Sequence, residues 1–243
     1  MASVMHHIAI GQLYYEKYLS DYSKKDKNRF LLGTIAADCG KNKELEQKRM
    51  KTHFIDNKLI DEKIDLSVFT PNIDFFIEKY NKELRDPFVL GYLVHLITDK
   101  FWFEVVIPIF IRKNLDLIDS SVKVMDDLSH QIFLNWYHDT VYADFDVHDI
   151  IIGAMVFGEK VEFPNFLEFD LSNLLVDIID EDELKKFLED NYERLKFVRD
   201  ISDEEAMEKF LAHKKDIKVA DLSTTSEFIN KCVDYCFEII NDN

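Results

Sequence analysis

Apolar residues recur at helical spacing along most of the chain. The first predicted helix covers residues 4–19, carries His6 and His7 near its start, and has apolar positions at Ile8, Ile10, Leu13, Tyr14 and Leu19. A short apolar helix over residues 29–37 follows, and Gly40 is a typical stop signal after it. Asp38 is therefore expected at the C-terminal end of a helix.

The middle of the chain predicts a fully buried helix. Residues 88–111 are apolar on nearly every face, as expected for a helix surrounded by others in an all-α domain. Asp86–Pro87 provides its start signal, with proline at the first helical position. Thr70–Pro71 gives the same signal for a preceding helix that runs to Leu84.

Further helices are predicted over residues 119–142, 147–158 and 181–199. Ser202 with Glu205, and Thr224 with Glu227, form capping boxes that would each open a late helix. With only 6 glycines and 4 prolines the chain lacks the turn residues of a sandwich or barrel. No linker or repeat is visible, so we predict one all-α, multi-helix domain over residues 1–243.

Composition narrows the function classes. The chain carries 30 basic against 47 acidic residues, a formal charge of −17 that repels nucleic-acid phosphates, so no nucleic-acid partner is expected. Three cysteines are too few for a disulfide framework, and the N-terminus lacks the pattern of a secretion signal. The most apolar segment, 101–111, contains Glu104 and is too short to span a bilayer. We expect a cytoplasmic protein without a transmembrane segment.

Two polar residues interrupt the predicted core helix. His95 and Asp99 are four positions apart, so both project from one helix face and could meet one metal ion. Burying an imidazole and a carboxylate among leucines and isoleucines is costly unless they are paired or bound to a cation. A hydrogen bond between the two and a metal site are both consistent with this pattern.

Three further polar residues stand alone at the ends or edges of apolar segments. They are His7, Asp38 and His53. With His95 and Asp99 they make three imidazoles and two carboxylates, a set of ligands that suits zinc and allows one or two ions.

Four segments containing these residues resemble the zinc-dependent phospholipase C family, which is all-α and shares its fold with fungal zinc nucleases. His7–Gly11 is similar to the histidine and apolar helix near the family's mature N-terminus. Gly33–Asp38 is similar to its second element, and Lys51–Phe54 contains its lone histidine. Gly91–Asp99 matches its most specific element, an H-x-x-x-D helix. The order and rough spacing agree over residues 1 to about 110.

The resemblance implies a ligand set and a chemistry. Asp38, His53, His95 and Asp99 would hold one zinc ion, with Asp99 bridging to a second ion held by His7. Residues 103–105 replace a further family ligand, so the ligand set is reduced. The metal-site half would cover about 1–112, and a helical extension about 113–243.

The expected activity is hydrolysis of phosphoester bonds by a metal-bound water. Asp38 is the candidate catalytic residue, to orient or deprotonate that water. A small phosphoester is the expected substrate, since the acidic chain discourages anionic surfaces, and a phospholipid is the other option. The side chains expected in the core rather than on a lipid-binding surface are Phe101, Trp102, Phe103 and Ile107.

Two alternatives remain open. Glu104 is a further candidate metal ligand. Residues 126–149 contain many more, namely Asp126, His130, His138, Asp139, Asp144, Asp146, His148 and Asp149. The doublets His138–Asp139 and His148–Asp149 resemble those of HD-domain metal phosphohydrolases, which gives a second enzyme hypothesis. The other alternative is a non-catalytic helical interaction protein with a degenerate metal site.

Overall fold

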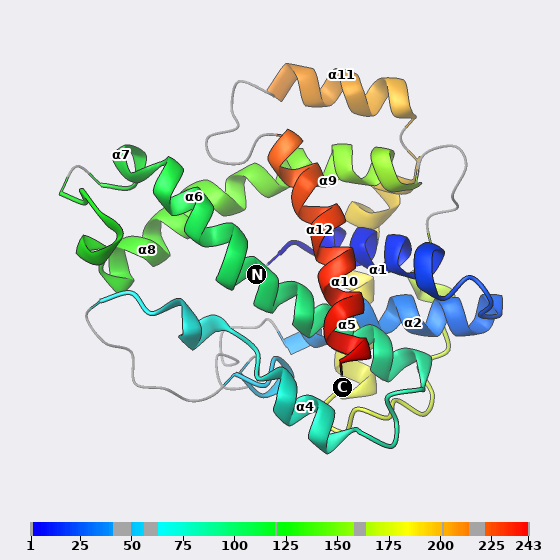
Figure 1. Ribbon diagram of the computed structural model, residues 1–243. Helices are drawn as coiled ribbons and strands as arrows, with labels where there is room; N and C mark the ends of the chain where they lie inside the picture. The colour runs from blue at the N-terminus through cyan, green and yellow to red at the C-terminus, as the bar shows by residue number, and fades with distance from the viewer. Residues whose placement is uncertain are drawn as a thin grey trace.

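The computed structural model describes residues 2–40, 50–55, 63–119, 121–157, 164–200, 202–213 and 222–242. Within these ranges the protein is all-α, and the β-type pairing there is confined to an isolated bridge between Lys63 and Ser129. The predicted fold class is confirmed. Figure 1 shows the helices crossing one another around α5, with α11 at one edge of the molecule and α4 at the opposite edge.

The helices of the first half are α1 (Val4–Tyr18), α2 (Lys24–Ala36), α4 (Ile73–Lys79), α5 (Pro87–Phe101), α6 (Ile107–Lys113) and α7 (Leu115–Ile118). Those of the second half are α8 (His130–Trp136), α9 (Tyr142–Phe157), α10 (Glu181–Asp200), α11 (Asp203–His213) and α12 (Leu222–Asn241). Two π-helical turns, η4 (Trp102–Val106) and η6 (Tyr137–Val141), join α5 to α6 and α8 to α9. Short 3₁₀ turns lie at η1 (Ala37–Gly40), η3 (Leu66–Phe69), η5 (Met125–Asp127) and η7 (Phe166–Glu168).

Two of the predicted helix starts are confirmed by side-chain caps. The Asp86 carboxylate accepts hydrogen bonds from the backbone N–H groups of Phe88 and Val89, and Pro87 is the first residue of α5. Before α11, the hydroxyl of Ser202 accepts a hydrogen bond from the Glu205 N–H at 3.2 Å.

Two other predicted starts are wrong. α4 begins at Ile73 rather than at Pro71, because the Asn72 side chain accepts a hydrogen bond from the Phe75 N–H at 3.0 Å and caps the helix there. α12 already begins at Leu222, so Thr224 lies inside the helix and does not open it.

Helix α5 is the centre of the fold, and α2 packs closely against it. A Cβ atom on Gly91 would lie 2.0 Å from the carbonyl oxygen of Phe30. The two backbones can approach so closely only because Gly91 has no side chain. This contact brings the C-terminal end of α2 and the turn η1 alongside α5.

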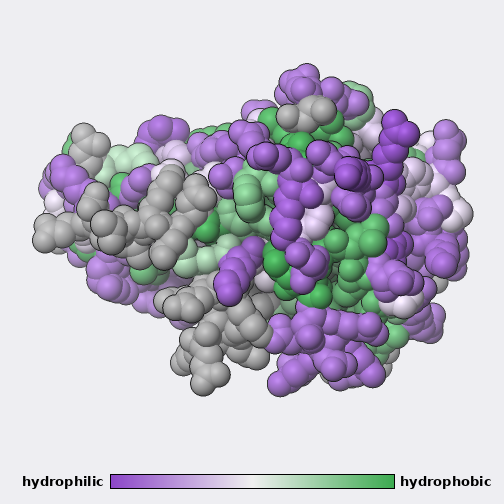
Figure 2. Space-filling view, turned by 90° about the horizontal axis from the view of Figure 1, so that it is seen from below, coloured by the Kyte–Doolittle hydropathy of each residue, from purple (hydrophilic) through white to green (hydrophobic). Residues whose placement is uncertain are grey.

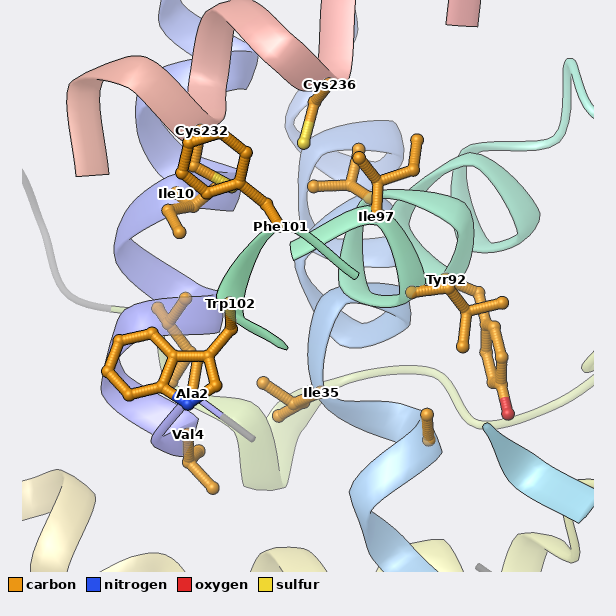
Figure 3. Packing of buried hydrophobic residues seen from close by; sticks show 14 of the residues in the cluster. Ala2, Val4, Ile10, Ile35, Tyr92, Ile97, Phe101, Trp102, Cys232 and Cys236 are labelled. Atoms are coloured by element: carbon orange, nitrogen blue, oxygen red, sulfur yellow. The ribbon is translucent and has the colours of Figure 1, made fainter. Parts of the chain in front are cut away.

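Helix α12 packs on α1 and α5, so the second half of the chain covers the first. Cys232 and Cys236 are buried free thiols, and Figure 3 shows them reaching from α12 toward Phe101 and Ile97 on α5. They are small core residues, as is usual for buried cysteines. The four side chains expected in the core, Phe101, Trp102, Phe103 and Ile107, are all buried, as predicted.

None of the described helices is long and apolar enough to cross a membrane. The face seen in Figure 2 is largely hydrophilic, with a smaller hydrophobic area among the charged residues. That distribution agrees with the large excess of acidic residues in the sequence.

Candidate metal centre

The five residues predicted as ligands come together in the interior. His7 comes from α1, Asp38 from η1, His53 from the segment 50–55, and His95 and Asp99 from α5. Each is at most 1% exposed. Their donor atoms form two overlapping groups in which all atoms lie within 4.8 Å of one another. We refer to these five residues as the His–Asp centre.

The two carboxylate oxygens of Asp99 face different imidazoles. Oδ1 lies 3.4 Å from Nε2 of His7. Oδ2 lies 3.5 Å from Nε2 of His53 and 3.8 Å from Nε2 of His95. The Asp99 carboxylate can therefore interact with His7 through one oxygen and with His53 and His95 through the other.

The remaining contacts make the centre compact. Asp38 Oδ1 lies 3.5 Å from Nε2 of His53, and Nε2 of His53 lies 3.3 Å from Nε2 of His95. The rings of His7 and His95 are stacked, with centroids 3.8 Å apart and planes 12° from parallel. His95 therefore lies between the group that contains His7 and the group that contains Asp38 and His53.

The backbone of α2 orients His95. The carbonyl oxygen of Thr34 lies 2.8 Å from Nδ1 of His95. Because a carbonyl only accepts, Nδ1 carries the proton and Nε2 presents its lone pair to the centre. A carbonyl behind an imidazole is the usual arrangement that fixes the tautomer of a metal-binding histidine.

The segment that carries His53 is held in place by α5. The Tyr92 hydroxyl donates a hydrogen bond to the carbonyl of Thr52, whose own hydroxyl lies 3.0 Å from Nδ1 of His53. Phe54 has a φ of 53°, a left-handed conformation that few non-glycine residues adopt. Its ring packs edge-on against Phe76 at 5.1 Å, which compensates for this local strain.

The protonation states in the His–Asp centre favour binding of a cation. Burial lowers the pKa of His95 to about 3, so this imidazole is neutral near pH 7. Burial raises the pKa of Asp99, but the adjacent His7 and His95 rings outweigh this effect and hold the pKa below its usual range. Within the described part of the chain, every ion-pair partner of Asp99 is a histidine. Two buried carboxylates beside a neutral imidazole fit a divalent cation.

Unsatisfied buried atoms support the same fit. Among the described residues, Oδ2 of Asp99 and both ring nitrogens of His7 lack a hydrogen-bond partner of normal geometry. Buried polar atoms rarely lack a hydrogen-bond partner in the protein unless an ion or a water molecule interacts with them. The buried cluster of His7, His53, His95 and Asp99 could therefore hold a metal ion.

Several other polar candidates lie away from the centre. Glu104 is exposed and pairs with Lys100 at 2.7 Å. The side chains of His138 and Asp139, one of the two His-Asp doublets, are 82% and 78% exposed. This surface position gives the doublet no part in the buried cluster.

The remaining candidates follow α8 and α9. His130 stacks on Phe69, with ring centroids 5.4 Å apart. Asp144 and Asp149 are buried, and Asp149 accepts a hydrogen bond from Ser3 rather than joining the centre. The side chains of Asp126, Asp146 and His148 lie outside those that the structure describes.

Sequence reasoning did not identify the groups that support the ligands. The backbone N–H of Ala2 donates to Oδ1 of Asp99 at 3.2 Å, and the Thr34 carbonyl fixes His95. Contacts made by backbone groups cannot be predicted from residue types, because nearly every residue carries the same N–H and C=O groups. The Tyr92 contact could have been suspected, since a tyrosine inside an otherwise apolar helix usually brings its hydroxyl to a partner.

Comparison of the chain with protein-family models, curated proteins and solved structures finds no match in any of the three. The geometry and chemistry of the His–Asp centre are therefore what indicate a function for this chain.

Proposed function

We propose that this chain is a metal-dependent phosphoester hydrolase, related to the zinc-dependent phospholipase C family, with zinc held in the His–Asp centre. The observation that carries this proposal is the position of Asp99, whose two oxygens face His7 on one side and His53 and His95 on the other. A buried carboxylate shared in this way is suited to a site with two adjacent ions.

The ligands divide into two sets. Asp38, His53 and His95 would hold one zinc ion together with Oδ2 of Asp99. His7 would hold the second with Oδ1 of the same carboxylate. Imidazole and carboxylate ligands suit zinc, although iron or manganese accepts the same donors.

The protein supplies fewer donor atoms than two zinc ions would need. One nitrogen from each of the three imidazoles and two oxygens from each of the two carboxylates make at most seven donor atoms. Two four-coordinate ions need about eight. At least one position would then be open to water or substrate, whereas one ion alone could be fully enclosed by the protein.

Zinc bound here would act as a Lewis acid toward a phosphoryl oxygen and would make water more acidic. The protein's contribution is orientation. Asp38 lies on the short turn η1, and if one of its carboxylate oxygens holds the ion the other can accept a proton from water, so we assign it the role of base. His95 is fixed by Thr34 and His53 by Thr52, so both imidazoles are oriented before any ligand arrives.

The substrate we propose is a small phosphoester. A chain with a formal charge of −17 repels anionic polymers and anionic lipid surfaces. Because Phe101, Trp102, Phe103 and Ile107 are buried, these four side chains do not form the apolar approach surface that a phospholipase would need.

The test is elemental analysis of untagged protein purified without chelator, alongside His53→Ala and His95→Ala. We expect two zinc ions per chain in the wild type and loss of metal in both variants, while His138→Ala, exposed and outside the centre, retains the wild-type content. Phosphomonoesters, phosphodiesters and phospholipids are then assayed with each protein. Hydrolysis that disappears with the metal supports the proposal. A folded wild type that binds no metal overturns it.

A second candidate function is a structural metal site in a non-catalytic helical protein. The observation that favours it is the burial of all five ligands, each at most 1% exposed, since structural sites are closed and catalytic sites keep an open position. One tightly held ion per chain, with no turnover of any of the three substrate classes, would decide for this candidate.

A further inference from the structure

A second buried polar network lies beside the His–Asp centre. Asp149, in the middle of α9, is 4% exposed, and its Oδ1 accepts a hydrogen bond from the Ser3 hydroxyl at 2.5 Å. The same hydroxyl caps α1 by accepting from the backbone N–H of His6 at 3.2 Å. It also lies 2.6 Å from Nδ1 of the His6 ring. Ser3 therefore links the start of α1 to a helix 146 residues further along the chain.

The proton positions in this network follow from the groups themselves. A serine hydroxyl has one proton to donate and two lone pairs to accept with. The carboxylate of Asp149 takes the proton, since it can only accept. Nδ1 of His6 must then carry a proton and donate to Ser3. All three hydrogen-bonding positions of the Ser3 oxygen are used, which fixes its orientation.

Ala2 and His7, which lie before and after the capping residue Ser3, both contact Oδ1 of Asp99 in the His–Asp centre. Ala2, immediately before Ser3, donates its backbone N–H to Oδ1 of Asp99 at 3.2 Å. His7, one turn after Ser3, places Nε2 3.4 Å from the same oxygen. Figure 3 shows Ala2 beside Trp102, the first residue of η4, which directly follows α5. Any rotation or displacement of the start of α1 would move both groups relative to Oδ1.

We propose that Asp149 is a positioning residue of the metal centre. Through Ser3 it fixes the first turn of α1, and this turn aims His7 and the Ala2 N–H at Oδ1 of Asp99. The inference rests on the proposed function only in requiring that the centre binds metal. Partners that orient ligands typically change metal affinity by about 10- to 100-fold when they are removed.

The experiment compares Ser3→Ala, Ser3→Thr and Asp149→Ala with the wild type. Each metal-stripped protein is titrated with Zn²⁺ in competition with a chromophoric chelator, and its unfolding midpoint is measured separately. Ser129→Ala is the matched control, because Ser129 caps α8 through the Ile132 N–H at 3.2 Å and has no contact with the centre. Threonine keeps both the hydroxyl and the capping ability of serine.

We expect Ser3→Ala and Asp149→Ala, each of which removes one partner of the Ser3–Asp149 hydrogen bond, to raise the apparent Zn²⁺ dissociation constant about 10- to 100-fold. Ser3→Thr should stay close to the wild type, and Ser129→Ala should lower the unfolding midpoint without changing affinity. If Ser3→Ala is as unstable as Ser129→Ala but binds Zn²⁺ like the wild type, the network is only a cap and the inference is wrong. A wild type that binds no Zn²⁺ overturns the proposed function together with this inference.

Discussion

Gly33 and Gly91 face each other where α2 crosses α5, and a Cβ on Gly91 would lie 3.2 Å from the Cα of Gly33. The contact is between backbones, without intervening side chains. One residue further along α2, the carbonyl of Thr34 meets His95, which lies one turn after Gly91 on α5. The close approach of the two helices is thus what allows a backbone carbonyl to orient a histidine of the His–Asp centre.

Replacing Gly91 by alanine should be severely destabilising. The new Cβ would lie 2.0 Å from the Phe30 carbonyl oxygen, and backbone cannot move aside as a side chain can. We expect a loss of at least about 3 kcal/mol in the free energy of unfolding, at the upper end for overpacked cores. Urea denaturation of the metal-stripped protein measures it.

The control is Gly11→Ala, whose Cβ would meet the Thr34 side-chain methyl at 2.7 Å. A side chain can adjust in part, so we expect about 1 kcal/mol. Equal losses for the two variants would contradict this account of the helix crossing.

Asp99→Asn should remove metal-dependent stabilisation. The substitution keeps the shape of the side chain but removes its charge and one of the two acceptor oxygens that face the histidines. In the wild type we expect a chelator to lower the melting temperature, since a ligand bound only to the folded state stabilises it. In Asp99→Asn the chelator should change nothing. Asp139→Asn, on the surface, serves as the control and should behave as the wild type. An equal chelator effect in Asp99→Asn would exclude Asp99 as a ligand.

The metal-stripped protein should lose stability as the pH falls below about 6.5. Burial lowers the pKa of His95 from 6.5 to about 3, so the unfolded chain takes up a proton that the folded chain rejects between these values. The stability is complete above pH 6.5 and declines toward pH 3, by up to about 1.4 kcal/mol per pH unit for this group.

Urea unfolding of the wild type and His95→Gln at pH 7.5, 6.5, 5.5 and 4.5 isolates this contribution, because glutamine does not titrate. The wild type should show the steeper decline below pH 6.5. Parallel curves for the two proteins would mean that His95 is not held neutral by burial.

Tyr92→Phe should weaken metal binding without altering any proposed ligand. Its hydroxyl donates to the Thr52 carbonyl, next to His53. We expect about a 10-fold rise in the apparent Zn²⁺ dissociation constant and a cost of about 1–2 kcal/mol in unfolding free energy. Tyr14→Phe, a buried tyrosine on α1, is the control for loss of a buried hydroxyl. Identical Zn²⁺ affinities in the two variants would show that the Thr52 contact does not position His53.

The all-α fold and the ligand candidates could be predicted because each has a local signature. The Asp86–Pro87 cap marks the start of α5, and the i, i+4 spacing places His95 and Asp99 on one helix face. The false start at Pro71 has a local cause as well, because the cap of Asn72 two residues later determines where α4 begins.

The contacts that orient the proposed ligands could not be predicted, because they join residues far apart in the sequence. Thr34 and His95 are 61 positions apart, and Ser3 and Asp149 are 146 apart. One of these partners is a backbone carbonyl, which every residue possesses. Asp149 was visible in the sequence as part of a His-Asp doublet, but its acceptance of the Ser3 hydroxyl depends on how α9 packs against α1.

The packing of α1 against α12 has a consequence for synthesis of the protein. Lys17 pairs with Asp234, 217 residues later, and Tyr18 stacks on Phe237. At about 5 to 20 residues per second, the ribosome needs roughly 10 to 40 s between these two helices. For that time α1 has left the ribosome, or is leaving it, with part of its apolar face uncovered. The nascent chain can therefore complete the packing around α1 only after α12 has emerged.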